Sequence, residues 1–201
     1  MKALFCSLIF LLFFSWPAFA GEVPENFRTY EVKKGDTLWN LAPQEHWELI
    51  EKVNKVDRYH LIPGRIILLP ENEKAHLYSQ LPEFVDNFQS VDKLFYVNLK
   101  KQCFGVYFFG KLQFWGPISS GKKGHETPTG WFKVLNKEVY RESIKYDYVP
   151  MPYSLRFYKG YFIHQQALPG KPASLGCVRL LEEDAKKVFS LFSKGDYIFI
   201  E

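Results

Sequence analysis

Long apolar runs are scarce in this sequence of 201 residues. The longest spans residues 3–14, follows the basic Lys2 and precedes the small residues Ala18 and Ala20. This arrangement predicts a cleaved signal peptide at residues 1–20. Because the run is too short for a typical transmembrane helix, we expect an exported protein without a stable membrane span after cleavage. An uncleaved anchor is the alternative.

Cysteine is also rare, with three residues. Cys6 lies inside the predicted signal peptide, which leaves Cys103 and Cys177 in the mature chain. An even number of cysteines in an oxidising compartment allows one disulfide. However, Cys103 lies in an apolar, strand-like run, where a free cysteine acts as a small buried hydrophobic residue, and Cys177 follows Gly176 in a turn. These different settings favour two free thiols, with the disulfide as the alternative.

Basic clusters, a complete P-loop and metal-ligand spacings are absent. The net charge is +4 and the Lys and Arg residues are scattered, which argues against binding to nucleic acid. The stretch GPISSGKK fails as a P-loop because Lys123 stands where a Ser or Thr must hold magnesium. His125, His164 and Cys177 lack a compact ligand spacing such as H-x-x-x-H. We therefore expect no metal, no cofactor and no nucleic-acid partner.

Residues 28–70 show the pattern of a small module. YEVKKGDTLWNLA gives an alternating strand, a Lys-Gly turn and a helix capped by Asp36 or Thr37. HWELIEKVNKV gives a second helix, and the turn IPG leads into the strand RIILLP. The predicted order is strand, helix, helix, strand. The polar residues 71–92 that follow predict a linker.

Residues 93–201 carry short aromatic and β-branched runs such as LFYVNL, CFGVYFF, LQFWGPIS and WFKVLN. Their close spacing predicts an antiparallel sheet, packed as a sandwich or barrel. Near the end, LEEDAKKVFSLF has one apolar helical face and acidic residues at its start, and YIFIE gives a last strand. The predicted fold class is mainly β: a small βααβ module followed by a β-sandwich with a C-terminal helix.

His164 and Cys177 are the best candidates for chemistry. His164 ends the apolar strand YFIH, and the loop after it is long enough to fold the thiol back onto the imidazole. A neighbouring imidazole raises the fraction of reactive thiolate. Gly176 allows a substrate to approach closely, and the Cys177 amide is placed to donate to a developing oxyanion. Spacing alone leaves open an alternative, in which His164 is an ordinary strand-end histidine and Cys177 an inert buried thiol.

The module resembles a LysM domain. The opening Y-x-V-x-x-G-D-T-L-W is present from Tyr30 to Trp39, and the closing L-I-x-P-G-x-x-I-x-L-P appears in looser form at residues 61–70. This resemblance implies binding to glycan that contains N-acetylglucosamine, above all peptidoglycan. The segment NKVDRYHLIPG is shorter than is usual in the family, so a packing module without sugar affinity is the alternative.

Residues 93–201 resemble the L,D-transpeptidase (YkuD-type) catalytic domain. Its signature H-x(n)-[ST]-x-G-C-[VI]-R-[LM] is met between His164 and Leu180, and HETPTGWF and GPISSGK are similar to its other motifs. The resemblance implies a β-sandwich that acts on the stem peptides of peptidoglycan, with Cys177 as nucleophile and His164 as base. It also implies a set of substrate-binding residues: Arg179, Gly176, Ser174 and Gln165.

By this resemblance, Cys177 attacks the third stem residue, expels the terminal D-alanine and forms a thioester. The amine of a second stem, a lipoprotein amine or water then resolves the thioester. The guanidinium of Arg179 suits a stem carboxylate, although a surface or helix-start arginine is the alternative. The implied location is the periplasm or cell wall.

Two residues depart from the family pattern. Leu175 stands where the family very often has His, and Gln165 stands where Gly or Ser is common. We interpret Leu175 as an altered wall of an active pocket. Two alternatives remain, a catalytically silent peptidoglycan-binding protein and an L,D-carboxypeptidase in which water outcompetes the amine.

Overall fold

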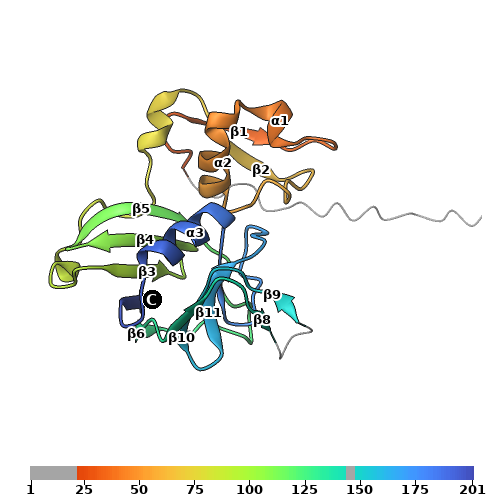
Figure 1. The fold of residues 1–201 in the computed structure, drawn as a ribbon. Helices are drawn as coiled ribbons and strands as arrows, with labels where there is room; N and C mark the ends of the chain where they lie inside the picture. The colour runs from red at the N-terminus through yellow and green to blue at the C-terminus, as the bar shows by residue number, and fades with distance from the viewer. Residues whose placement is uncertain (1–21, 144–147) are drawn as a thin grey trace, which may run out of the picture.

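The computed structural model describes residues 22–143 and 148–201. The predicted signal peptide lies outside these residues. Figure 1 shows a small N-terminal module at the top and a larger, mainly β body below it. Across the two described ranges, no helix has both the length and the apolar character needed to cross a membrane.

The N-terminal module has the predicted βααβ order. Its elements are β1 (Phe27–Glu31), α1 (Leu38–Leu41), the 3-10 helix η1 (Gln44–His46), α2 (Trp47–Asn54) and β2 (Ile66–Pro70). Strands β1 and β2 pair antiparallel. Thr37 is the N-cap of α1, and its backbone N donates to Asn40 Oδ1 at 2.9 Å. Asp36 instead accepts from Tyr30 Oη at 2.9 Å and from Lys33 N at 2.7 Å, which closes the preceding turn.

The larger body is a two-sheet sandwich, and this confirms the predicted fold class. Its elements are β3 (Leu94–Asn98), β4 (Cys103–Phe108), β5 (Lys111–Pro117), β6 (Gly130–Lys133), β7 (Asn136–Glu138), β8 (Glu142–Ser143), β9 (Val149–Pro150), β10 (Ser154–Tyr158), β11 (Tyr161–Gln165), β12 (Val178–Leu180), α3 (Glu182–Leu191) and β13 (Tyr197–Ile200). One sheet has the order β5-β4-β3-β13-β6 and the other the order β12-β11-β10-β7. Strands β8 and β9 form a separate hairpin.

The expectation of purely antiparallel pairing is wrong for two pairs. Strand β13 runs parallel to β3, and β12 runs parallel to β11. Parallel neighbours need a crossover connection, because a tight turn can only reverse the chain. For β11 and β12 this connection is residues 166–177, which we call the crossover loop. It begins just after His164 and Gln165 and ends at Cys177.

Helix α3 and the inner faces of both sheets enclose the main core. The predicted apolar face of α3 is largely buried, with Ala185 and Val188 at most 1% exposed. They contact strand residues such as Phe95, Ile163 and Ile198, which are also almost fully buried. Burial of this kind stabilises a fold by roughly 1.5–3 kcal/mol for each large apolar side chain. Strands β11 and β12 therefore rest on a rigid support.

The segment at residues 71–92, which we expected to be a linker, contains the 3-10 helices η2 (Glu73–Leu77) and η3 (Asp86–Phe88). Its Leu81 and Phe88 belong to a group of buried side chains that spans both bodies, which we call the junction cluster. The buried members are Phe27, Leu49, Val53, Leu68, Ala75, Leu81, Phe88, Leu94, Tyr96, Cys103, Tyr107 and Trp115. The cluster joins the module to the outer face of the larger sheet.

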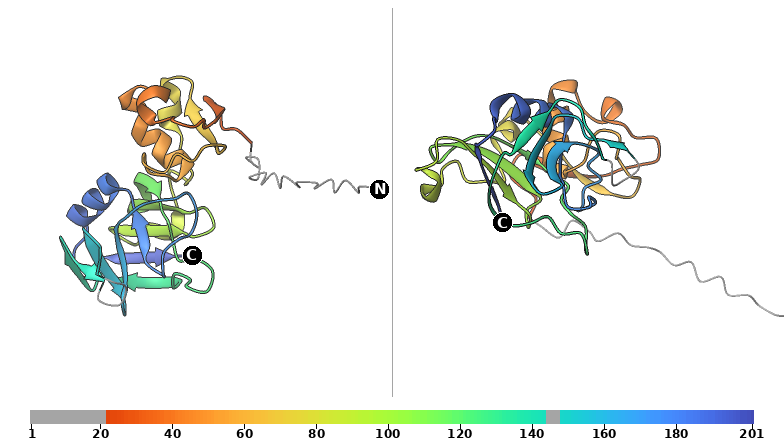
Figure 2. Two further views of the ribbon diagram at one scale, coloured as in Figure 1. Left: turned by 90° about the vertical axis from the view of Figure 1, so that its right-hand side faces the viewer. Right: turned by 60° about the horizontal axis from the view of Figure 1, so that its bottom comes forward.

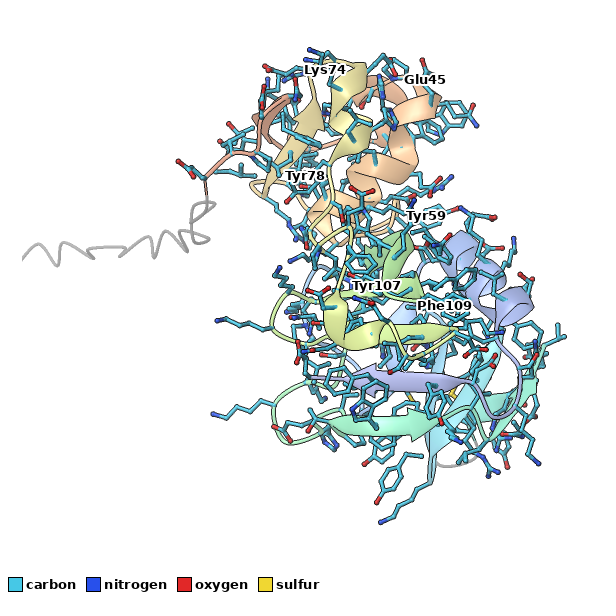
Figure 3. The ribbon with its side chains drawn as sticks, turned by 90° about the vertical axis from the view of Figure 1, so that its left-hand side faces the viewer. Glu45, Tyr59, Lys74, Tyr78, Tyr107 and Phe109 are labelled. Atoms are coloured by element: carbon cyan, nitrogen blue, oxygen red, sulfur yellow. The ribbon has the colours of Figure 1, made fainter. Side chains whose placement is uncertain are left out.

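Tyr78 shows how close this packing is. Its ring makes edge-on contacts with Phe27 of β1, at 5.4 Å between centroids, and with Trp115 of β5, at 6.1 Å. Figure 3 shows Tyr78 at the boundary between the two bodies and Tyr107 inside the larger one. Ion pairs also cross this boundary, between Lys52 Nζ and Asp184 Oδ1 at 3.8 Å and between Lys187 Nζ and Glu48 Oε1 at 3.7 Å. The left view of Figure 2 shows the two bodies directly against each other.

Candidate active site

Parallel pairing places His164 on β11 and Cys177 directly before the neighbouring β12, with both side chains on the same face of the sheet. In the register of β11 and β12, Ile163 faces Val178 and His164 faces Arg179. Side chains alternate between the two faces of a strand, so Ile163 and Val178 enter the core while His164 and Cys177 lie on the opposite face. Both of these side chains line one cavity of about 580 Å³.

The cavity contains most of the predicted site residues. His164, Ser174, Leu175, Cys177 and Arg179 line it, together with Arg141, Glu142, Ser143, Val149, Met151, Lys159, Gly160, Tyr161, Phe162 and Gln166. Two predicted residues are not part of this lining. Gln165 contributes its carbonyl from behind His164, and Gly176 shapes the turn that carries Cys177.

His164 is only 2% exposed, and its Nδ1 lies 2.9 Å from the carbonyl oxygen of Gln165. A carbonyl oxygen only accepts, so Nδ1 carries the proton and donates it, which leaves the neutral ring with a free lone pair on Nε2. Burial lowers the pKa of His164 to about 4, against the opposing effect of the Gln165 bond, and the nearby Arg179 charge lowers it further. The imidazole is therefore neutral at pH 7.

Cys177 is a free thiol, as is the fully buried Cys103, so the alternative of a disulfide between them is wrong. Burial raises the pKa of Cys177, while a backbone hydrogen bond with Phe162 and the charge of Arg179 act in the opposite direction. The resting pair is therefore a neutral thiol and a neutral imidazole. A neutral thiol is a weak nucleophile, so any attack by this sulfur would require its deprotonation.

The turn before Cys177 depends on Ser174 and Gly176. Ser174 Oγ donates to Cys177 O at 2.6 Å and accepts from Gly176 N at 3.1 Å, so this hydroxyl is engaged within the turn. Gly176 has φ +113°, and a Cβ on it would lie 2.2 Å from the Tyr161 ring. A left-handed backbone against an aromatic ring requires glycine at this position.

Serine residues after β5 hold the other side of the crossover loop. Ser119 Oγ donates to Lys171 O at 2.8 Å and accepts from Ala173 N, and Ser174 N donates to Ser120 O at 3.0 Å. Ser119 also exchanges two backbone hydrogen bonds with Arg179, each 3.1 Å long. The GPISSGK segment thus positions the turn, a role that its similarity to a family motif did not specify.

Arg141 is a second arginine of the cavity, and the sequence did not point to it. Arg141 precedes the β8–β9 hairpin, its Nη1 lies 2.7 Å from Glu138 Oε1, and its guanidinium lies 4.8 Å from the centre of the Phe162 ring. Phe162 could have been found, because it lies two residues before His164 and so faces the same side of β11. Arg141 had no such signal. With Arg179, it gives the cavity two guanidinium groups, in addition to the ammonium of Lys159.

No metal site accompanies this cavity. Among the residues that the structure describes, no three His, Cys, Asp or Glu side chains come together as metal ligands would. The cavity lining includes one thiol, one imidazole and two guanidinium groups, together with Glu142 and Lys159. A thiol and an imidazole are suited to acyl transfer, and guanidinium groups are suited to carboxylate recognition.

Two segments of the chain match known protein families. Residues 92–200 match YkuD, the L,D-transpeptidase catalytic domain, and residues 30–70 match the LysM domain. This chain belongs to the YkuD family of L,D-transpeptidase catalytic domains. The His164 and Cys177 cavity lies within the YkuD domain, and the βααβ module is its LysM domain. No match was found among proteins of curated function.

Solved structures agree with this family. An L,D-transpeptidase (Yku) from Stackebrandtia nassauensis is 31% identical, with a TM-score of 0.52 over 55% of each chain. Two others show the fold alone. An L,D-transpeptidase from Mycobacterium smegmatis is 21% identical, with a TM-score of 0.51 over 55% of this chain and 58% of that one. One from Mycobacterium tuberculosis H37Rv is 24% identical, with a TM-score of 0.51 over 55% and 57%. The chain spans little more than half the length of these neighbours.

Leu175, which stands where the family very often has His, lies in the wall of the cavity. Leu175 is partly exposed and lines the cavity beside Gly176 and Cys177. An apolar side chain at this place adds no titratable group, so His164 is the one imidazole among the described residues that line the cavity.

Proposed function

We propose that this protein is an exported peptidoglycan L,D-transpeptidase that works through a thioester on Cys177, in the periplasm or cell wall. The observation that carries this proposal is a single cavity lined by the Cys177 thiol, the His164 imidazole and two guanidinium groups. A thiol beside a fixed imidazole is suited to acyl transfer, and the family of the chain supports the same reaction class.

In the proposed first step, His164 Nε2 takes the thiol proton as Cys177 Sγ attacks the carbonyl of the third stem residue. A C–S bond forms, and the bond to the terminal D-alanine breaks. The leaving amine takes the proton back from His164. The Cys177 amide is our candidate donor to the oxyanion, and donors of this kind contribute several kcal/mol to acyl-transfer enzymes, on the order of 3.

In the second step, an acceptor amine attacks the thioester, a new amide bond forms, and the C–S bond breaks. His164 carries the proton from the amine to the departing sulfur, which restores the thiol. An acceptor stem gives a 3→3 cross-link, and a lipoprotein amine gives an anchored protein. Water in the same place gives a trimmed tripeptide, which is the L,D-carboxypeptidase alternative.

Arg141 and Arg179 are proposed to bind the stem carboxylates. Arg179 Nε is buried and has no hydrogen-bond partner among the described residues, and the same is true of Arg141 Nε. Burial also lowers the pKa of Arg179, which reflects the cost of keeping a cation there without a matched anion. A carboxylate would supply that anion and form a bidentate pair with a guanidinium fork.

The LysM domain is proposed to bind the glycan strand. Trp39 is 78% exposed and Tyr59 is 86% exposed, so both aromatic rings are accessible to a glycan. Trp39 also makes an edge-on contact with Trp47 at 4.6 Å, so its ring is held in place. If Trp39→Ala leaves the binding of the full chain to purified wall unchanged, the packing-module alternative is favoured.

Mass analysis of muropeptides tests the function directly. The mature protein is incubated with a tetrapeptide-containing donor, with Cys177→Ala as the control. We expect 3→3 dimers and an acyl adduct on Cys177. Tripeptide without dimers would indicate the carboxypeptidase, and a reaction that requires a peptide amine would indicate protein anchoring. Wall binding without any adduct would support the catalytically silent alternative.

A further inference from the structure

The crossover loop is held from two sides, and one of them is the LysM domain. Its second half is bound by Ser119 and Ser120, as described above. Its first half contacts the segment that follows α2. Among the described residues, the hydrogen bonds of residues 167–170 are made with Asp57 and Arg65.

Asp57 binds Leu168 at two points. Its backbone N donates to Leu168 O at 3.2 Å, and its Oδ2 accepts from Leu168 N at 2.8 Å. The other carboxylate oxygen, Oδ1, accepts from Tyr59 N at 3.0 Å and from His60 Nδ1 at 2.6 Å. The carboxylate is therefore fixed within its own domain, and its bond to Leu168 N is charge-assisted and stronger than a neutral one.

Neighbouring contacts extend this attachment. Val56 forms a β-bridge with Pro169, and Arg65 Nη1 donates to Pro169 O at 3.2 Å. A Cβ on Gly170 would lie 2.2 Å from the Arg65 guanidinium, so this glycine lets the arginine pack against the loop. Leu168 itself is fully buried. The first half of the crossover loop is thus built onto the LysM domain.

This part of the loop is continuous with the support of His164. Gln165 O accepts from His164 Nδ1. Gln166, the next residue in the chain, donates from its backbone N to Leu180 O at 3.2 Å. Only Gln166 and Ala167 separate Leu168 from Gln165, so a displaced Leu168 would pull on the carbonyl that selects the tautomer and the orientation of the imidazole. Two bonds oppose this pull, from Gln166 N to Leu180 O and from Gln165 N to Pro152 O at 3.0 Å. Errors of about 1 Å in the position of a catalytic group can slow a reaction by roughly 10²-fold.

We propose that Asp57 of the LysM domain is a positioning residue for the transpeptidase reaction, acting on His164 through Leu168 and the Gln165 carbonyl. This inference rests on the proposed role of His164 as the base. It gives the LysM domain a part in the chemical step, in addition to any binding of glycan.

The test is the rate of Cys177 acylation by a small, glycan-free stem tetrapeptide, measured with the full mature chain. We expect Asp57→Ala to lower kcat by roughly 10- to 100-fold with KM unchanged, because the reacting groups are misaligned while the carboxylate-binding arginines are intact. Asp57→Asn keeps an oxygen that can accept from Leu168 N and should recover most of the rate.

Asp36→Ala is the matched control. Asp36 also accepts two hydrogen bonds within the LysM domain, from Tyr30 and Lys33, but these close a turn of that domain. This variant should lose stability without losing kcat. Nitrogen-15 NMR of the His164 ring adds a second readout: the Nδ1–H tautomer should persist in Asp36→Ala and become mixed in Asp57→Ala.

The outcomes separate this inference from the proposed function. A wild-type protein that is not acylated on Cys177 would overturn the function before any variant is compared. If the wild type is acylated and Asp57→Ala behaves as Asp36→Ala does, or changes KM alone, the positioning role is wrong. Should Asp57→Ala not fold, Arg65→Ala, which removes the bond to Pro169 O, must show the same loss of kcat; otherwise the role is also wrong.

Discussion

Gly176→Ala is the perturbation whose cost can be worked out most directly from the structure. Gly176 has φ +113°, and a Cβ there would lie 2.2 Å from Tyr161 Cε1 and 2.7 Å from Tyr161 Cδ1. Two penalties therefore add. A non-glycine residue in this part of backbone space costs about 1–3 kcal/mol, and forcing an extra carbon into a packed site costs about 1–3 kcal/mol more.

Gly130 provides a matched control that isolates the second penalty. Its φ is +118°, close to that of Gly176, but a Cβ there would meet no atom within 4 Å. Gly130→Ala should therefore cost about 1–3 kcal/mol of unfolding free energy, and Gly176→Ala should cost a further ~1–3 kcal/mol. Urea denaturation measures both, provided the m-values agree.

Tyr161→Ala completes the test as a double-mutant cycle. Adding it to Gly176→Ala should recover much of the steric part, giving a favourable coupling energy on the order of 1–3 kcal/mol. Acylation of Cys177 should also slow in Gly176→Ala, because the adjacent thiol has to move. The reasoning is refuted if Gly176→Ala costs no more than Gly130→Ala, or if the cycle shows no coupling.

Four further predictions concern the residues of the cavity and the two thiols. His164→Ala should lower kcat/KM for acylation by at least ~10²-fold, whereas Leu175→Ala should cost much less and Leu175→His should stay active; equal losses would show that His164 is not the sole base. Because burial lowers the pKa of His164 to about 4, the base is neutral above that pH and is lost below it, so the acid limb of the pH–rate profile should lie near pH 4. Arg179→Ala should weaken the use of carboxylate-bearing donors and leave the melting temperature unchanged, and an unaltered kcat/KM would remove it from the site. Iodoacetamide should label Cys177 before the fully buried Cys103, and faster as the pH rises, since burial raises the pKa of both thiols; a non-reduced mass lower by two hydrogens would contradict two free thiols.

The sequence predicted the local structure of this chain well. Alternating residues and turn signals predicted β2, and the β-branched and aromatic runs predicted β3 to β5. The predicted first strand began at Tyr30, three residues later than β1 does. Such patterns depend on neighbours within a few residues, so they can be read without knowing the fold. The aligned motif around His164 and Cys177 likewise identified two side chains that line one cavity.

Pairings over long sequence separations could not be predicted in the same way. A strand of the type YIFIE is compatible with either direction of pairing, and the parallel match of β13 with β3 depends on how the whole sandwich closes. The bond between Asp57 and Leu168 joins residues of two domains. Nothing in the sequence distinguishes Asp57 from any other polar loop residue, because its partner Leu168 is 111 residues away in the chain.

The junction cluster removes the freedom that a binding domain usually has on a tether. A flexible linker lets the two domains that it joins sample many separations. A ligand bound to one domain can then reach the site on the other domain from a wide range of positions. Here Leu81 and Phe88 of the connecting segment are buried in the junction cluster. The separation between the exposed Trp39 surface and Cys177 is therefore set by packing. If the LysM domain holds a glycan strand, only a stem peptide at one distance from the bound sugar would reach the cavity. The fixed arrangement of the two domains would then determine which stem along the strand reacts.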